Sequence, residues 1–331
     1  MIRVAIVGTG GMGSVHYHNY LHIEDCEVAA LVDITPESAA RSKDWNLPLY
    51  PTISEMVKHE NVDVVDVCTP TFLHKTHVME GLENGLHAIT EKPIALHKKD
   101  AEEMYAMADA RGRLLFVGQV LQFTKEVEVL RELVRNQTYG KVLDAYFVRL
   151  SACPRWVKNG WLFDRERSGL LPFDLHIHDL DVIISLFGKP ESFAFTSCGN
   201  DDKNYKEHYR FNYNYDGFNV AAEAAWYNAD FPFTANWRFY FENAVVVNDG
   251  TKVIAYQFDH EPHIFDTEET VKIPTGINLP PTGMFYAELS HFMNCIRAGK
   301  PSELVTRKQV LTVVELLEEI SQIESNQEVR K

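Results

Sequence analysis

The first third of the chain alternates short apolar runs with amphipathic stretches. The apolar runs, rich in β-branched residues, lie at 2–7, 28–32, 62–67, 86–89 and 114–117. Strands that are apolar on both faces are typical of a parallel sheet covered by helices on both sides. The stretches between them predict helices over 12–21, 36–44, 53–58, 74–84 and 98–111. Residues 1–120 are therefore expected to form a doubly wound α/β domain.

The pattern changes after residue 120. A helix, a long strand, a loop rich in Pro, Arg, Trp and Gly, and a second helix are predicted, in that order, over 125–136, 142–150, 153–169 and 172–186. From 191 to 273 aromatic and polar residues alternate, which indicates a sheet that is packed on one side only. Two final helices, at 282–298 and 306–324, could cover this sheet or return to the first domain. Residues 121–331 are thus predicted to form an α+β domain.

Composition and charge narrow the function classes. The 331 residues suit two domains, and 45% hydrophobic with 24% charged residues is ordinary for a globular protein. Lys and Arg number 32 against 47 Asp and Glu, a net charge of −15 that disfavours nucleic acid. No apolar run approaches the roughly 20 residues of a membrane span, and the first residues resemble a strand rather than a leader. We expect a small-molecule partner, with neither nucleic acid nor membrane.

The cysteines indicate a compartment. Five are present, scattered, odd in number and never at the spacing of a zinc site. A reducing cytoplasm is the expected location, with the cysteines acting as small apolar side chains.

Residues 8–13 read Gly-Thr-Gly-Gly-Met-Gly, directly after the first predicted strand and at the start of a helix. Gly8 permits a tight turn, Gly10 lets the backbone approach a pyrophosphate, and Gly13 allows close helix–strand packing. Asp33 ends the second strand, 20 residues after Gly13, where a carboxylate binds ribose hydroxyls and repels a 2′-phosphate. The motif therefore favours NAD over NADP, although a methyltransferase could use the same glycines and acid. The candidate cofactor-binding residues here are Gly8, Gly10, Gly11, Met12, Gly13, Asp33 and Ile34.

Two further motifs follow predicted strands, at the edge where open α/β sheets bind ligands. Residues 68–71 read Cys-Thr-Pro-Thr, with His74 after them, and a turn that caps the next helix would have the same pattern. Glu91-Lys92-Pro93 follows the next strand, where Lys92 could orient a hydroxyl and stabilise negative charge on its oxygen. A surface lysine before a helix is the alternative, and the proline permits a cis peptide bond. The candidate cofactor-binding residues at this edge are Cys68, Thr69, Pro70, His74, Glu91, Lys92 and Gln119.

A fourth motif, Asp-Leu-His-Ile-His-Asp-Leu-Asp, covers residues 174–181. On a helix Asp174 and His178 share a face, and a histidine is suited to accept an alcohol proton near neutral pH. The alternative is a helix-capping acid beside a buried histidine. His176 and Asp179 would point away from that face, so the four side chains cannot converge and no metal site is expected. Ile177, Leu180 and Ile184 are predicted to form the buried flank of the helix.

Taken together, the motifs resemble the Gfo/Idh/MocA oxidoreductase family over essentially the whole chain. The resemblance is carried by GTGGMG with Asp33, and by CTPTFLH, GLHAITEKP, DLHIHDLD and YAELSHFMNCIRAGKP. It implies a Rossmann domain followed by a domain with a large, mostly antiparallel open sheet, through which copies form a homodimer or homotetramer. It also implies Lys92, Asp174 and His178 as the catalytic group, without metal. The chain departs from the family at residues 169–172, Gly-Leu-Leu-Pro, where further glycines are frequent, which leaves the substrate open.

The resulting hypothesis is NAD-dependent oxidation of a secondary alcohol on a sugar or cyclitol. His178 would take the hydroxyl proton, Lys92 would steady the oxygen, and Asp174 would position His178 or the substrate. The candidate substrate contacts are Lys92, Gln119, Arg155, Trp161, Asp174 and His178. A non-catalytic NAD-binding sensor or scaffold, and a methyltransferase, are the alternatives. The aromatic face of the sheet at 209–241 could bind a partner, and self-association of this chain is the simpler use of that face.

Overall fold

The computed structural model describes residues 1–277 and 279–329, which form two compact units. The first unit comprises Met1–Phe123 and Glu269–Glu318, and the second comprises Thr124–Glu268 together with the chain from Glu319 onward. This differs from the predicted division at residue 120, because residues 269–318 return to the first unit. From the sequence, the two final helices could either cover the second sheet or return to the first domain.

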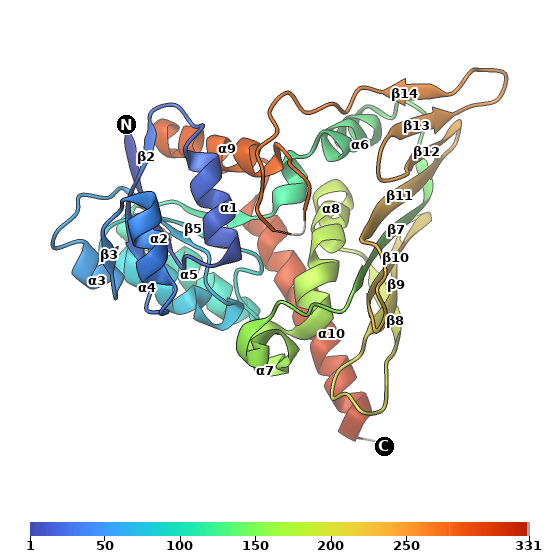
Figure 1. The fold of residues 1–331 in the computed structure, drawn as a ribbon. Coiled ribbons are helices and arrows are strands. Elements are labelled where there is room, and N and C mark those ends of the chain that lie inside the picture. The colour runs from blue at the N-terminus through green and yellow to red at the C-terminus, as the bar shows by residue number, and fades with distance from the viewer. Residues whose placement is uncertain (278, 330–331) are drawn as a thin grey trace. The chain divides into compact units, whose positions relative to one another are not determined.

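The first unit contains a six-stranded sheet in the order β3-β2-β1-β4-β5-β6, in which every neighbouring pair is parallel (Figure 1). The strands are β1 Ile2–Val7, β2 Cys26–Val32, β3 Leu49–Tyr50, β4 Val64–Val67, β5 His87–Glu91 and β6 Leu115–Gly118. The predicted doubly wound fold is confirmed. Only β3, with two residues, escaped the sequence analysis, since so short a strand has no periodicity to detect.

Both faces of this sheet are covered by helices. Those between the strands are α1 Gly11–Tyr20, α2 Ser38–Trp45, α3 Ile53–Met56, α4 His74–Glu83 and α5 Lys98–Arg111. Successive residues of a strand point to opposite faces, and Val65 packs in the core that includes Leu82 of α4. Val64 packs in the opposite core with Tyr20 of α1 and Phe292 of α9 (Met284–Ala298). Thus α9 belongs to the first unit because it covers apolar positions on β1, β4 and β5.

The second unit contains an eight-stranded sheet in the order β14-β13-β12-β11-β7-β10-β9-β8. The strands are β7 Val142–Ala152, β8 Ser192–Cys198, β9 His208–Tyr215, β10 Phe218–Tyr227, β11 Thr234–Phe241, β12 Ala244–Asn248, β13 Val253–Tyr256 and β14 His263–Phe265. All neighbouring pairs are antiparallel except β7 with β10. The expected large, mostly antiparallel sheet is therefore confirmed.

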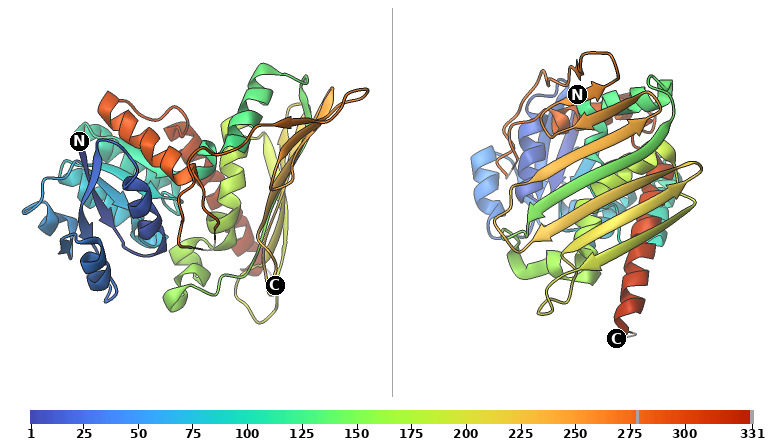
Figure 2. Two further views of the ribbon diagram at one scale, coloured as in Figure 1. Left: turned by 45° about the horizontal axis from the view of Figure 1, so that its top comes forward. Right: turned by 90° about the vertical axis from the view of Figure 1, so that its right-hand side faces the viewer.

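One face of this sheet is covered and the other is open (Figure 2). The inner face packs on α8 (Ile177–Phe187), which lies beside α6 (Lys125–Asn136), and on the end of α10 (Arg307–Val329). Tyr209, Phe211 and Tyr213 are buried on it. The aromatic face is therefore internal, which corrects the prediction that it serves a partner.

Within the part of the chain that the structure describes, no helix combines the length and apolarity needed to cross a membrane.

Candidate active site

The glycine turn between β1 and α1 has the geometry that the sequence predicted. Gly8 has φ of +91°, and a Cβ there would lie 2.9 Å from the Thr69 methyl group. A Cβ on Gly13 would overlap the carbonyl oxygen of Gly8, so helix and strand approach too closely for any side chain. A Cβ on Gly10 would meet nothing within 4 Å. The start of α1 at Gly10 therefore leaves space beside the backbone, as phosphate binding at a helix N-terminus requires.

Asp33, at the end of β2, is held by the glycine turn itself. Its Oδ2 accepts hydrogen bonds from both the backbone N–H and the hydroxyl of Thr9, each at 2.7 Å. Its Oδ1 accepts one from the backbone N–H of Thr35 at 2.7 Å. Burial opposes ionisation, but these donors outweigh it and lower the pKa of Asp33 below 3.8. A fixed, charged carboxylate thus lies beside the turn, with Ile34 exposed next to it.

The ends of β4 and β6 carry two polar atoms that fit a bound dinucleotide. The Oγ1 of Thr69 and the Oε1 of Gln119 are buried and have no hydrogen-bond partner among the described residues. Such atoms are rare in native proteins, and a ligand is one explanation for them. Together with the glycine turn and Asp33, they fit NAD, which would lie with its pyrophosphate at α1 and its ribose at Asp33.

Cys68 and His74, both predicted to bind the cofactor, direct their polar side-chain atoms into the protein. The Cys68 sulfur lies 3.4 Å from Nδ1 of His16, and burial raises the pKa of Cys68 to about 12, so the thiol stays neutral. The two ring nitrogens of His74 each lie 2.8 Å from a carbonyl oxygen, one of Pro93 and one of Thr69. His74 therefore joins the turns that follow β4 and β5.

Lys92 follows β5 directly and is half-buried. The Lys92–Pro93 peptide bond is cis, as the sequence permitted. The backbone N–H of Lys92 donates to Oε2 of Glu91 at 3.0 Å. Gly118 of β6 lies beside this carboxylate, and a Cβ there would be in ordinary van der Waals contact with it, 3.5 Å from Cδ of Glu91.

Asp174 and His178 lie in the second unit on a helix that changes type between them. A single helix over 172–186 was predicted, but residues Pro172–His176 form a π-helical turn and α8 begins at Ile177. The wider π turn alters the angular spacing between Asp174 and His178 that the prediction assumed. The buried flank of Ile177, Leu180 and Ile184 is confirmed.

The chain departs from the family pattern at residues 169–172, which lead into this π-helical turn. Gly169 and Leu170 have φ of +73° and +63°, a left-handed conformation that favours glycine. A Cβ on Gly169 would overlap the Phe173 ring. Leu170 adopts the same conformation without being glycine, and its side chain is buried.

His176 and Asp179 hold the second unit together. Nε2 of His176 lies 2.7 Å from the Tyr213 hydroxyl, and its ring stacks on Phe211 at 3.9 Å. Burial lowers the pKa of His176 to about 3. Asp179 accepts two hydrogen bonds from Arg149, at 3.0 and 2.7 Å.

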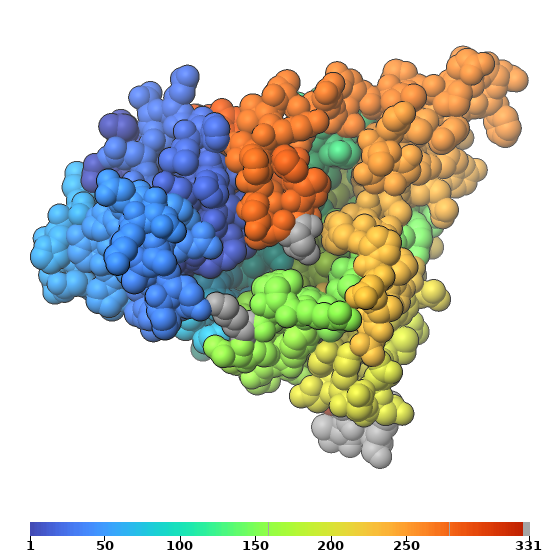
Figure 3. Space-filling model, viewed as in Figure 1, coloured from blue at the N-terminus to red at the C-terminus, as the bar shows by residue number. Residues whose placement is uncertain are grey.

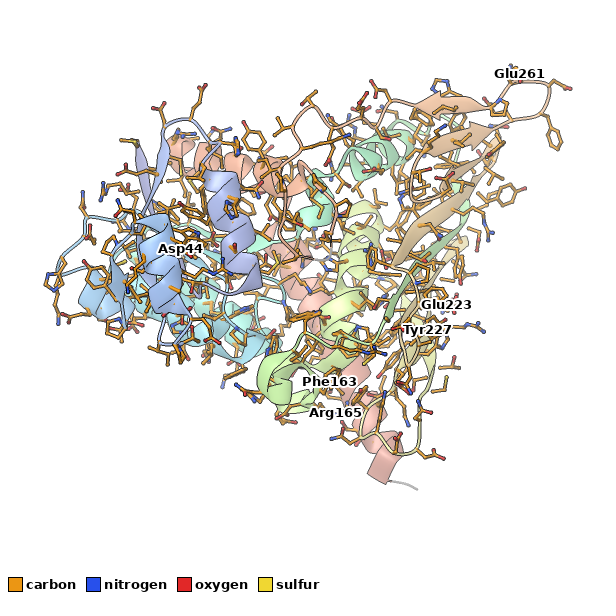
Figure 4. The ribbon with its side chains drawn as sticks, viewed as in Figure 1. Asp44, Phe163, Arg165, Glu223, Tyr227 and Glu261 are labelled. Carbon is orange, nitrogen blue, oxygen red and sulfur yellow. The ribbon has the colours of Figure 1, made fainter. Side chains whose placement is uncertain are left out.

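The loop that carries Arg155 and Trp161 is anchored by an aromatic residue that the sequence analysis missed. Arg155 is exposed and lies 3.4 Å from Asp230, and Trp161 is half-buried. Phe163 stacks on Tyr205 at 5.3 Å, where the loop runs into α7 (Arg165–Ser168; Figure 4). The sequence signal that could have identified Phe163 is an aromatic residue in a loop rich in tryptophan.

Comparison with known proteins decides the family. The model of an oxidoreductase family with an NAD-binding Rossmann fold matches residues 2–119, and the model of the GFO/IDH/MocA C-terminal domain matches residues 127–249. The chain belongs to the GFO/IDH/MocA oxidoreductase family.

Individual relatives of this GFO/IDH/MocA protein are moderately similar. D-glucoside 3-dehydrogenase from Escherichia coli is 32% identical over 195 residues, which cover 57% of this chain and 55% of the relative. 2,7-anhydro-N-acetylneuraminate hydratase from Mediterraneibacter gnavus is 30% identical over 197 residues, 59% of this chain and 52% of the relative. The chain thus spans about half the length of the curated relatives it matches. The solved structure of aldose-aldose oxidoreductase from Caulobacter crescentus shares the fold, with a TM-score of 0.83, 21% identity, and coverage of 97% and 96%.

The sequence analysis also missed a buried polar cluster in the first unit. It consists of His16, Tyr20, Asp66, Cys68 and Glu91, called the His16 cluster below. The ligand atoms of His16, Asp66 and Cys68 lie within 4.8 Å of one another, close enough to consider a metal. However, Nδ1 of His16 is 2.7 Å from Oδ2 of Asp66, whereas two ligands of one tetrahedral zinc lie about 3.3 Å apart. The distance between His16 and Asp66 is therefore that of a hydrogen bond. The sequence signal that could have identified this cluster is Asp66, a charged residue within the otherwise apolar strand β4.

The two buried histidines predict opposite pH dependences of stability. Burial acts to lower the pKa of His16, but Asp66 and Cys68 outweigh it and raise that pKa well above 6.5. His16 therefore stabilises the fold fully below pH 6.5, and this contribution falls as pH rises toward its raised pKa, by up to about 1.4 kcal/mol per pH unit. His176, with its lowered pKa, stabilises the fold fully above pH 6.5 and loses this contribution on acidification.

We expect the difference in unfolding free energy between wild type and His16→Asn to shrink above pH 6.5. The corresponding difference for the control, His176→Asn, should shrink below it. Urea titrations at pH values below and above 6.5 measure both differences. Parallel pH profiles for the two variants would contradict the assigned directions of the two pKa shifts.

Proposed function

We propose that this protein is an NAD-dependent dehydrogenase that oxidises a secondary alcohol of a sugar or cyclitol. The observation that supports it best is the carboxyl edge of the first sheet. There a fixed Asp33 carboxylate and the open first turn of α1 accompany Lys92, which follows a strand of the same sheet. Ligands of open α/β sheets bind at this edge. The name of the E. coli relative, a D-glucoside 3-dehydrogenase, supports the substrate class.

The nicotinamide supplies a hydride acceptor when it is bound. Lys92 donates a hydrogen bond to the alcohol oxygen and stabilises the negative charge that grows there as the C–H and O–H bonds break. An imidazole nitrogen of His178 accepts the hydroxyl proton, and Asp174 orients His178 or a neighbouring substrate hydroxyl. The products are a ketone, a reduced nicotinamide and one proton.

The direct test is the absorbance of reduced nicotinamide when protein and NAD are mixed with inositols, hexoses, glycosides and sugar acids. Appearance of the signal with one class supports the dehydrogenase and names the substrate. Calorimetry with NAD and S-adenosylmethionine separates it from a methyltransferase. NAD binding without conversion of any compound favours a sensor or scaffold.

A relative named as a hydratase calls for a second readout. Substrate consumption is therefore followed by chromatography at catalytic amounts of NAD. Consumption without net reduced nicotinamide would replace the dehydrogenase with a reaction that adds or removes water. Formation of one reduced nicotinamide per substrate would support the proposal.

We expect Asp33→Ala to raise KM for NAD about tenfold, since a charged hydrogen bond to the ribose is lost. KM for NADP should fall or stay unchanged, because the repulsion of the 2′-phosphate is removed. The ratio of kcat/KM values for the two cofactors measures this. Asp44→Ala, an exposed acid near the end of α2, is the control and should leave the ratio unchanged. An unaltered ratio in Asp33→Ala would remove Asp33 from cofactor selection.

The open face of the second sheet is proposed as the interface between copies of this chain. Its outward side chains, which pair across the strands, include Tyr146, Val148, Leu150, Arg238, Tyr240, Val245, Val247, Ile254, Tyr256 and Ile264. The hairpin of β13 and β14 lies at the edge of this sheet and protrudes at the upper right of Figure 3, and Tyr240, Tyr256 and Ile264 on the open face are about half exposed. Exposed apolar and aromatic side chains gathered on one face are typical of an interaction surface.

Val247→Asp should therefore reduce the oligomer to single chains of 37.9 kDa, because a charge would be buried in the interface. Light scattering after size exclusion measures the mass. Lys99→Asp, which places the same charge on α5 of the first unit, should leave the oligomer intact. A wild type that is already monomeric would overturn the proposal.

A further inference from the structure

The His16 cluster joins three elements of the first unit. His16 comes from the middle of α1, Asp66 and Cys68 from the end of β4, and Glu91 from the end of β5. Nδ1 of His16 lies 2.7 Å from Oδ2 of Asp66, and Nε2 lies 3.1 Å from Oε1 of Glu91. The helix that begins at the glycine turn is thus linked to the strand end that carries Lys92.

Glu91 connects this link to the backbone of Lys92. One carboxylate oxygen faces the imidazole, and the other accepts the Lys92 N–H at 3.0 Å. Glu91 is buried, and burial acts to raise its pKa, but the His16 imidazole beside it outweighs this and lowers it. A buried carboxylate needs such a partner to stay ionised in place.

The surroundings of His16 favour an imidazolium. The titratable groups that face it are Asp66, Cys68 and Glu91 from the two strands, with Tyr20 of its own helix donating to Asp66 at 2.9 Å. From α9 the Phe285 ring lies 6.2 Å from the His16 ring. A cation here lies beside both carboxylates, at 2.7 and 3.1 Å, whereas a neutral ring has one N–H and could donate to only one of them.

We propose that His16 is a positioning residue for Lys92, holding Glu91 so that the backbone entering Lys92 has one direction. This rests on the proposed function, in which the Lys92 ammonium acts on the substrate oxygen. The same link fixes α1, so that the segment expected to hold the pyrophosphate and the lysine expected to face the alcohol are set by one buried histidine. Neither the family match nor the names of the relatives assign a role to this side chain.

The test compares His16→Asn with Tyr20→Phe. Asparagine can still donate to Asp66 but cannot reach Glu91, so kcat should fall about 10- to 100-fold with KM for NAD changed less than about threefold. Tyr20→Phe removes one hydrogen bond to Asp66 and leaves the His16–Glu91 pair, so kcat per cofactor-binding site should match wild type. Titration with reduced nicotinamide counts the binding sites, so that loss of folded protein is not mistaken for loss of turnover.

The second arm repeats His16→Asn in a Lys92→Ala background. If His16 acts through Lys92, the added substitution lowers kcat by less than about twofold. A further 10- to 100-fold loss, or an unchanged kcat in His16→Asn alone, would overturn the positioning role. If instead Lys92→Ala itself leaves turnover unchanged, the proposed function of Lys92 fails, which separates the two failures.

Discussion

Lys92→Ala is expected to lower kcat by about 10³-fold while leaving the affinity for NAD within about threefold of wild type. The ammonium is proposed to stabilise charge that develops on the alcohol oxygen only as the hydride leaves, so its loss falls on the transition state. The pyrophosphate and the ribose of the cofactor are assigned to other groups, the first turn of α1 and Asp33, which this substitution does not touch. Steady-state kinetics and calorimetry with NAD measure the two effects separately.

Two variants serve as controls for Lys92→Ala. Lys92→Arg keeps the charge but replaces a compact ammonium by a planar guanidinium. We therefore expect its kcat to lie between those of wild type and Lys92→Ala. Lys75→Ala removes a lysine on α4 whose ammonium pairs with Asp100 and Glu103 at 2.6 Å, and it should leave kcat unchanged. Equal losses for Lys75 and Lys92 would indicate a general effect of charge rather than a role in the reaction.

Arg149→Ala is expected to destabilise the second unit by about 3–5 kcal/mol. Arg149, on the inner face of β7, donates two hydrogen bonds to Asp179 on α8, and both side chains are almost fully buried. Removing the guanidinium leaves a buried carboxylate without its cation, which costs more than the pair contributes. Urea unfolding followed by tryptophan fluorescence measures the change.

The matched control is Arg210→Ala on the outer face of the same sheet. Arg210 lies 3.5 Å from Glu223 but is 69% exposed, so its loss should cost less than about 1 kcal/mol. A double variant, Arg149→Met with Asp179→Leu, should recover most of the stability because no uncompensated charge remains. Equal costs for Arg149→Ala and Arg210→Ala would mean that burial does not govern this pair.

The local signals of the first unit were strong enough to predict it from sequence. Apolar runs of four to six residues defined five of its six strands, and the glycine spacing defined the turn, since each signal is complete within about 30 residues. The position of Lys92 at the carboxyl end of a parallel strand follows from the same pattern. Each of these features depends on neighbours in the chain, which a single sequence displays.

The His16 cluster illustrates what a single sequence hides. His16 and Glu91 are separated by 75 positions, and each alone resembles a common surface or capping residue. Their contact depends on the order β1-β4-β5, which places the ends of these strands side by side. The change from π to α geometry between Asp174 and His178 is similarly invisible, because one inserted turn leaves the apolar periodicity almost unaltered.

The sequence by itself determined the parallel sheet, the glycine turn with Asp33, and the residue types available for hydride-transfer chemistry. It also determined that the second sheet has one aromatic and one polar face, because side chains alternate along a strand. Only the tertiary structure decided that the aromatic face is the one α8 covers, and that α9 returns to the first unit. Periodicity specifies that a face must be buried, but the partner that buries it is a contact between residues far apart in the chain.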